Sequence, residues 1–157
     1  MRGIRAWTLI VLGLLAIIPW TTMALAQFKL PFAKSQPKIG WLGDPQVAVA
    51  QARKLDRPLL VYVTAGYCGA CRKMERETWS NTKVIDKINA NFVALKLDAE
   101  KHSELASQLE VVALPTVLVF CQDGKRLDSL EGFQSTDELL KVLAKKDRPI
   151  AQVTPKK

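Results

Sequence analysis

The stretch TAGYCGACRKM, residues 64–74, holds two of the three cysteines of this chain, Cys68 and Cys71. The run directly before them, LLVYVT at 59–64, is apolar and β-branched, which predicts a strand buried on both faces. The residues at 69–78 favour a helix. The two cysteines are therefore expected where a buried strand passes into a helix, with the first of them at the helix N-terminus.

This position predicts different chemistry for the two thiols. Backbone N–H groups and the helix macrodipole stabilise a thiolate at Cys68, whereas Cys71 lies one turn further in and is shielded. We expect Cys68 to attack a substrate disulfide and Cys71 to resolve the mixed disulfide by attacking Cys68. The small residues between them, Gly69 and Ala70, leave Cys68 accessible.

A Cys-x-x-Cys pair can also be half of a zinc site or a structural disulfide. Zinc needs about four ligands, and the chain offers only Cys121 and His102 besides the pair. A disulfide across so short a loop stabilises little. The sequence therefore favours a redox centre without metal or cofactor. Cys121 is interpreted as a small buried residue, with an intermolecular disulfide as the alternative, and His102 as a surface residue.

Pro115 stands directly before an apolar run at 116–120 that predicts a second buried strand. Proline cannot donate a hydrogen bond to a sheet. A cis Leu114–Pro115 peptide bond explains why a proline is tolerated there.

The rest of the pattern predicts an α/β fold, with a central mixed sheet, helices on both faces and an extra N-terminal helix. Asp44 before Pro45 marks the start of that extra helix, and Ser135 with Glu138 forms a capping box for the last one. A turn at Asp123–Gly124 joins the last two strands. The expected helices are 44–55, 69–78, 81–91, 102–110 and 135–144, and the expected strands are 59–64, 92–98, 116–120 and 126–133.

The first 26 residues have the anatomy of a secretory signal peptide. Arg2 and Arg5 precede an uncharged apolar run at 7–18, and Ala-Leu-Ala ends the segment at Ala26. The run is about a dozen residues long, short of the roughly 20 that span a bilayer. We expect cleavage after Ala26, with an uncleaved anchor as the alternative. The remaining predicted parts are a lead-in at 27–43, one domain at 44–146 and a disordered tail at 147–157.

Export would place the chain in the periplasm or outside the cell, where thiols tend to be oxidised. The formal net charge is +8, but the basic residues are spread along the chain. A nucleic-acid-binding protein gathers them on one face, so no nucleic-acid partner is expected. The length of 157 residues fits one domain, and we expect a monomer.

YCGAC after one buried strand and LPT before another resemble the thioredoxin family. RPLLVYVTAGYCGACRKMERETWSNTKVIDKIN and VVALPTVLVFCQDGK are most similar to the C-terminal periplasmic domain of DsbD-type thiol:disulfide interchange proteins and their free-standing secreted relatives. The resemblance runs from about residue 41 to 143. It implies a nucleophile at Cys68, a resolving thiol at Cys71, and a cis-proline at Pro115 that helps to bind an extended substrate peptide by strand addition. The other residues implied beside the site are Tyr67, Gly69, Ala70 and Leu114.

Three positions depart from the family pattern. Tyr62 stands where family members often carry a buried acid, Tyr67 replaces the usual tryptophan, and Ala94 matches the lysine that thioredoxin holds near that acid. Glu75 matches a second carboxylate of the DsbD-like relatives. Four residues after Cys71 on a helix, it shares that residue's face, and we hypothesise that it accepts the Cys71 proton. The alternative is a solvated glutamate in a charged segment.

Together these features predict an exported thiol:disulfide oxidoreductase that reduces protein disulfides. The Gly-Ala spacer lacks the histidine of strongly oxidising relatives, and a less stabilised thiolate gives a more reducing couple. A reductase needs an electron donor, for which a membrane thiol transporter is expected. The alternatives are a disulfide oxidase, a thioredoxin-fold binding, chaperone or assembly module, and a donor dedicated to one client such as an apocytochrome c.

Overall fold

The computed structural model describes residues 37–146. The predicted signal peptide and the predicted tail lie outside the described residues. Within 37–146, no helix is both long and apolar enough to cross a membrane. In chain order the elements are β1 (Trp41–Leu42), α2 (Pro45–Leu55), β2 (Leu59–Thr64), α3 (Gly69–Glu77), α4 (Thr82–Asn91), β3 (Val93–Asp98), α5 (Ser103–Gln108), β4 (Thr116–Phe120), β5 (Arg126–Glu131) and α6 (Thr136–Lys146).

The strands form one mixed sheet in the order β1-β3-β2-β4-β5. β3 runs parallel to both β1 and β2, while β4 runs antiparallel to both β2 and β5. All six residues of the central strand β2 are buried, as its continuous apolar run predicts. The predicted mixed sheet with a terminal antiparallel hairpin is confirmed.

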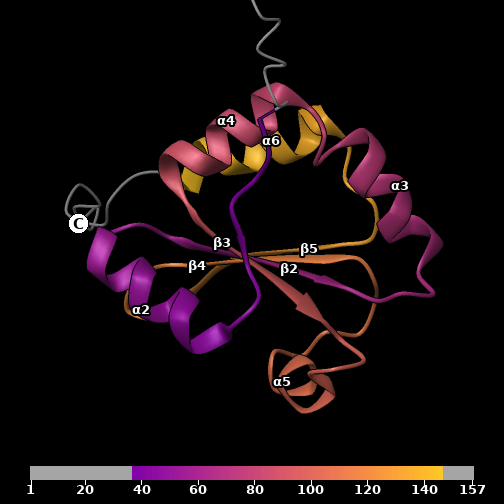
Figure 1. Ribbon diagram of the computed structural model, residues 1–157, viewed down its shortest axis with the longest axis horizontal. Helices are drawn as coiled ribbons and strands as arrows, with labels where there is room; N and C mark the ends of the chain where they lie inside the picture. The colour runs from indigo at the N-terminus through magenta and orange to yellow at the C-terminus, as the bar shows by residue number, and fades with distance from the viewer. Residues whose placement is uncertain (1–36, 147–157) are drawn as a thin grey trace, which may run out of the picture. The chain divides into compact units, whose positions relative to one another are not determined.

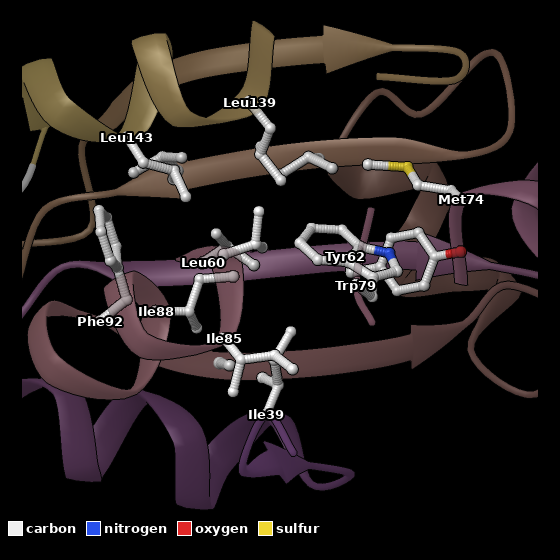
Figure 2. Packing of buried hydrophobic residues seen from close by; sticks show 14 residues of the cluster. Ile39, Leu60, Tyr62, Met74, Trp79, Ile85, Ile88, Phe92, Leu139 and Leu143 are labelled. Atoms are coloured by element: carbon white, nitrogen blue, oxygen red, sulfur yellow. The ribbon is translucent and has the colours of Figure 1, made fainter. Parts of the chain in front are cut away.

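Helices cover both faces of the sheet, as predicted (Figure 1). α4 and α6 lie over one face and α2 and α5 over the other. Side chains of β2 alternate between the two sides, so that Leu60 and Tyr62 enter one core and Leu59, Val61 and Val63 the other. Figure 2 shows the first core, in which ten labelled residues interlock: Ile39, Leu60, Tyr62, Met74, Trp79, Ile85, Ile88, Phe92, Leu139 and Leu143.

The two predicted helix starts are confirmed by their hydrogen bonds. Asp44 Oδ1 accepts the backbone N–H groups of Gln46, at 2.8 Å, and Val47, at 3.1 Å. Glu138 Oε2 accepts the backbone N–H of Ser135 at 3.0 Å, and Ser135 Oγ accepts the backbone N–H of Glu138 at 3.4 Å. These contacts satisfy N–H groups that have no partner inside a helix.

The last residues of the predicted lead-in belong to the fold. Ile39 is buried in the first core, and Trp41–Leu42 forms β1, paired with Ala94 and Leu95 of β3. Asn89 holds this segment, because its side chain accepts the N–H of Gly40 and donates to the carbonyl oxygen of Lys38. A two-residue strand is too short to show an alternating pattern, and its pairing partner is remote in sequence.

Candidate active site

Cys68 and Cys71 form a disulfide at the start of α3, with their Cα atoms 5.2 Å apart. Cys68 is the N-cap of the helix, and its sulfur accepts the backbone N–H of Cys71 at 3.1 Å. The exposed fraction is 7% for Cys68 and 1% for Cys71. The helix terminus therefore points an N–H group at the Cys68 sulfur, which favours a thiolate there once the disulfide is reduced.

The peptide bond between Leu114 and Pro115 is cis. It lies beside the disulfide, because Leu114 packs against the cluster formed by Ala65, Cys68 and Cys71. Hydrogen bonds hold this loop: Thr116 Oγ1 donates to Ala113 O at 2.7 Å, and the Gly132 N–H donates to Pro115 O at 2.7 Å. Two segments remote in sequence thus meet at one site.

A cavity of about 540 Å³ adjoins the Cys68 side of the disulfide. Tyr67 and Val112 stand among its lining residues with exposed fractions of 73% and 81%, the highest of the large apolar side chains in 37–146. The lining carries no charged side chain. It consists of Tyr67, Cys68, Gly69, Ala70, Ala99, Ala106, Val111, Val112, Ala113 and Leu114. We call this cavity the groove.

A second cavity, of about 490 Å³, adjoins Cys71 and has a different chemistry. Four of its lining residues are charged: Arg72, Glu75, Lys96 and Asp98. β1, which the sequence did not predict, supplies part of its wall through Trp41 and Leu42. We call this cavity the charged cavity.

Tyr62 lies in the first core, in ring contact with Trp41 and Trp79 at centroid distances of 5.7 and 5.0 Å. Its hydroxyl donates to the backbone carbonyl of Cys71 at 3.3 Å. Burial raises the pKa of Tyr62 above its usual value. The phenol therefore stays protonated at neutral pH and cannot take up the proton that a buried acid would accept at this position.

Glu75 projects from α3 and forms an ion pair with Lys96 of β3, with Nζ 2.6 Å from Oε1. Both side chains are 39% exposed, so the carboxylate is neither buried nor fully solvated. Tyr62 pairs with Lys96 in the sheet, whereas Ala94 lies opposite Leu60. The strand register therefore places Lys96, and not Ala94, beside Tyr62. Counting along one strand does not reveal the register of two strands.

Cys121 follows the end of β4, while Pro115 precedes its start, so the third cysteine lies about 20 Å from Pro115, at the far end of the strand. It is buried and free, which confirms the interpretation as a small buried residue. Its S–H donates to Asp123 Oδ1, and burial raises its pKa. His102 is half-buried at the start of α5 rather than exposed, because α5 packs onto the sheet through Leu105.

Sequence reasoning named the disulfide, the proline and Glu75, and it missed other residues around them. Lys96 could have been found, since it is the one charged side chain between Val93 and Leu97 in an apolar strand. Arg72 and Glu100, which bind the loop before Cys68, carry no recognisable pattern.

Comparison with known proteins agrees with this geometry. Residues 45–147 match the family model described as Thioredoxin-like domain. The chain is 31% identical over 88 residues to the thiol:disulfide interchange protein DsbD of Campylobacter jejuni, covering 54% of this chain and 15% of that protein. The chain spans 15–19% of the length of the first curated relatives it matches.

Two solved structures share the fold. A thioredoxin from Thermus thermophilus superposes with a TM-score of 0.63 at 26% identity, over 69% of this chain and 86% of that one. The C-terminal domain of Neisseria meningitidis DsbD in its oxidised form gives 0.56 at 20% identity, over 68% and 98%. With a helix-terminal Cys-x-x-Cys disulfide, a facing proline loop and a family match over most of its length, the chain belongs to the thioredoxin-like domain family.

Proposed function

We propose that this protein is an exported thiol:disulfide oxidoreductase that reduces protein disulfides through Cys68 and Cys71. The observation that carries the proposal is the disulfide at the start of α3, in which Cys68 lines an uncharged groove and Cys71 lines a charged cavity. The relatives named as thiol:disulfide interchange proteins and the solved thioredoxin support it.

The reaction is a pair of exchanges. In the reduced protein the Cys68 thiolate attacks a substrate disulfide, forms a mixed disulfide with one sulfur and releases the other as a thiolate. Cys71 then loses its proton and attacks Cys68, which closes the Cys68–Cys71 disulfide and releases the second substrate thiolate. The substrate gains two electrons and two protons, one released by Cys71 and one that the solution received when Cys68 became a thiolate. A dithiol donor returns two electrons and two protons to the two cysteines in the same way, and Cys68 gives up its proton again when it ionises.

Glu75 is the proposed acceptor of the Cys71 proton. Its carboxylate lines the charged cavity together with Cys71, and Lys96 holds it there. Tyr62, which replaces the acid of many relatives, is a donor to the Cys71 carbonyl and supplies no base. Of the two carboxylates on α3, Glu75 lines the same cavity as Cys71, so it is the proposed receiver of a proton released at Cys71.

The groove is the proposed substrate surface. It runs beside Cys68 between Tyr67, Gly69 and Ala70 on one side and the loop that ends in Leu114 and Pro115 on the other. An extended peptide that carries a disulfide would pair with the backbone of this loop by strand addition. The uncharged lining, with Tyr67 and Val112 exposed, fits a substrate segment with small or apolar side chains beside its cysteine.

The proposed setting is the periplasm or the exterior of the cell, reached through the predicted signal peptide at 1–26, with a monomeric domain that includes β1 as well as the predicted 44–146. The reducing direction requires an electron donor, and the likeness to DsbD-type proteins makes a membrane thiol transporter the proposed one. No metal, cofactor or nucleic acid takes part in the exchange as written.

Reduction of insulin by the protein, with dithiothreitol as the donor, tests the activity. Wild type should reduce insulin, Cys68→Ser should not, and Cys71→Ser should accumulate a mixed disulfide through Cys68. A disulfide that cycles without turning over insulin would point to one dedicated client. Absence of any redox cycling would leave a binding module and refute the proposal.

The direction is tested separately, by equilibrating the Cys68–Cys71 pair with glutathione. A potential near about −270 mV supports a reductase, and one near about −120 mV an oxidase.

A further inference from the structure

The loop that carries Cys68 is tied to its surroundings through Gly66. β2 ends at Thr64, and a turn follows in which the Cys68 N–H donates to Ala65 O at 3.2 Å. Gly66 lies inside this turn, two residues before the cysteine. Ala65 and Cys68, at the ends of the turn, are buried, but its middle makes few apolar contacts, because Gly66 has no side chain and Tyr67 projects into solvent. The position of the middle of the turn therefore depends on the hydrogen bonds made by its peptide groups.

Two charged side chains from different elements bind Gly66. Glu100, in the loop after β3, accepts the Gly66 N–H through Oε2 at 2.9 Å. Arg72, in the first turn of α3, donates from its guanidinium to Gly66 O at 2.9 Å. Hydrogen bonds in which one partner is charged are stronger than neutral ones. The peptide groups on both sides of Gly66 are thus fixed by opposite charges.

The backbone that carries each of these two side chains is itself held in place. The Glu100 N–H donates to Asp98 Oδ1 at 3.0 Å, and the neighbouring Ala99 N–H donates to Thr64 O at 2.8 Å, so the Glu100 loop is anchored to the end of β2. The Arg72 N–H donates to Cys68 O at 3.2 Å. Arg72 therefore binds the chain on both sides of Tyr67, through its backbone at Cys68 and its side chain at Gly66.

Glycine suits the position for a steric reason. A Cβ atom added at Gly66 would lie 3.3 Å from Glu100 Oε2, closer than most such contacts. The carboxylate would have to move by a few tenths of an ångström. The close approach of Glu100 to the loop backbone thus depends on the missing side chain.

We propose that Arg72 and Glu100 are positioning residues for Cys68. By fixing both peptide groups of Gly66, they hold the Cys68 sulfur in line with Cys71 whether or not the two sulfurs are bonded. This inference rests on the proposed function, in which Cys68 must accept attack by Cys71 after it has reacted with a substrate. When reacting groups lose their correct positions, the reaction between them slows by large factors.

The test is the rate at which Cys71 closes the disulfide after the reduced full chain has been mixed with oxidised glutathione. We expect Glu100→Ala and Arg72→Ala each to slow closure by about tenfold, the loss of one charge-assisted hydrogen bond. Glu100→Gln should stay within about twofold of wild type, since its amide oxygen still accepts the Gly66 N–H. Gly66→Ala should fall between them. Glu104→Ala, an exposed glutamate on α5, is the matched control.

Three outcomes would overturn the inference. Closure in Glu100→Ala could equal that in Glu104→Ala, or Glu100→Gln could be as slow as Glu100→Ala, which would assign the effect to charge alone. A fall in unfolding midpoint without a change in closure rate would assign a purely structural role. If wild type formed no mixed disulfide with glutathione, the proposed function itself would fail, and that failure is recognised without any variant.

Discussion

Lys96 Nζ lies 2.6 Å from Glu75 Oε1, so an ion pair joins β3 to α3 at the wall of the charged cavity that also contains Cys71. The pair stands next to Tyr62, the residue that replaces the acid of many relatives. The site thus has a carboxylate, Glu75, and a cation, Lys96, but the carboxylate comes from α3 instead of the central strand β2.

Replacing Glu75 by Gln should slow the attack of Cys71 on the mixed disulfide. Removing a positioned base typically costs about 100-fold, and the loss should shrink as pH rises and Cys71 ionises unaided. The measurement is the closure rate against pH. Glu77→Gln, on the same helix and paired with Lys73, is the control and should follow wild type. An unchanged pH profile for Glu75→Gln would rule out its role as the acceptor.

A charge placed in the groove should weaken substrate binding. We expect Val112→Asp to raise KM for an apolar peptide disulfide by about tenfold, since burying a valine contributes about 1.5–3 kcal/mol. The reaction with dithiothreitol should not change. Val47→Asp adds the same charge to another exposed valine, on α2, and serves as the control. Equal KM values for the two variants would exclude Val112 from the substrate surface.

The Tyr62 hydroxyl should contribute to stability rather than to proton transfer. Tyr62→Phe leaves the carbonyl of Cys71 without this donor inside the core, and the free energy of unfolding should fall by about 1 kcal/mol. The closure rate of the disulfide should keep its pH profile. Chemical denaturation gives the first quantity and the glutathione assay the second. A shifted pH profile would show that the phenol takes part in the proton transfer.

The Cys121 thiol should be unreactive in the native protein. Burial raises its pKa, so it carries less thiolate at any given pH than an exposed cysteine does. After reduction, iodoacetamide at neutral pH should modify Cys68 and spare Cys121 until denaturant is added, as mass spectrometry of the peptides would show. Cys121→Ala should leave the potential of the Cys68–Cys71 pair unchanged. Native labelling of Cys121 at the rate of Cys68 would contradict this.

Because of the capping box of α6, the free energy of unfolding should decrease at acid pH. Hydrogen bonds from Ser135 lower the pKa of Glu138 below its usual value of 4.5. The folded state therefore binds this proton less readily than the unfolded state. The stabilisation is fully present above pH 4.5 and is lost as pH falls through the folded pKa. Glu138→Gln should flatten this loss in acid unfolding curves.

Local signals accounted for most of the fold. The apolar run of β2, the Asp44 and Ser135 caps and the turn at Gly124 each depend on neighbours in the chain, and each appears where the sequence predicts it. β1 was missed because it exists only through its pairing with β3. Lys96 stands out in the sequence as a charge in an apolar strand, but its place beside Tyr62 is a property of strand register, which the sequence did not show. Residues that act through a remote partner are the ones a single sequence conceals.

The two cysteines of the disulfide line different cavities. Cys68 lines the groove, where a substrate would lie, and Cys71 lines the charged cavity. A partner seated in the groove would therefore leave the charged cavity in contact with water. Disulfide exchange with the substrate would then take place in the groove, and proton transfer in the charged cavity. A docked complex could still exchange protons with the surrounding solution while the sulfur bonds rearrange.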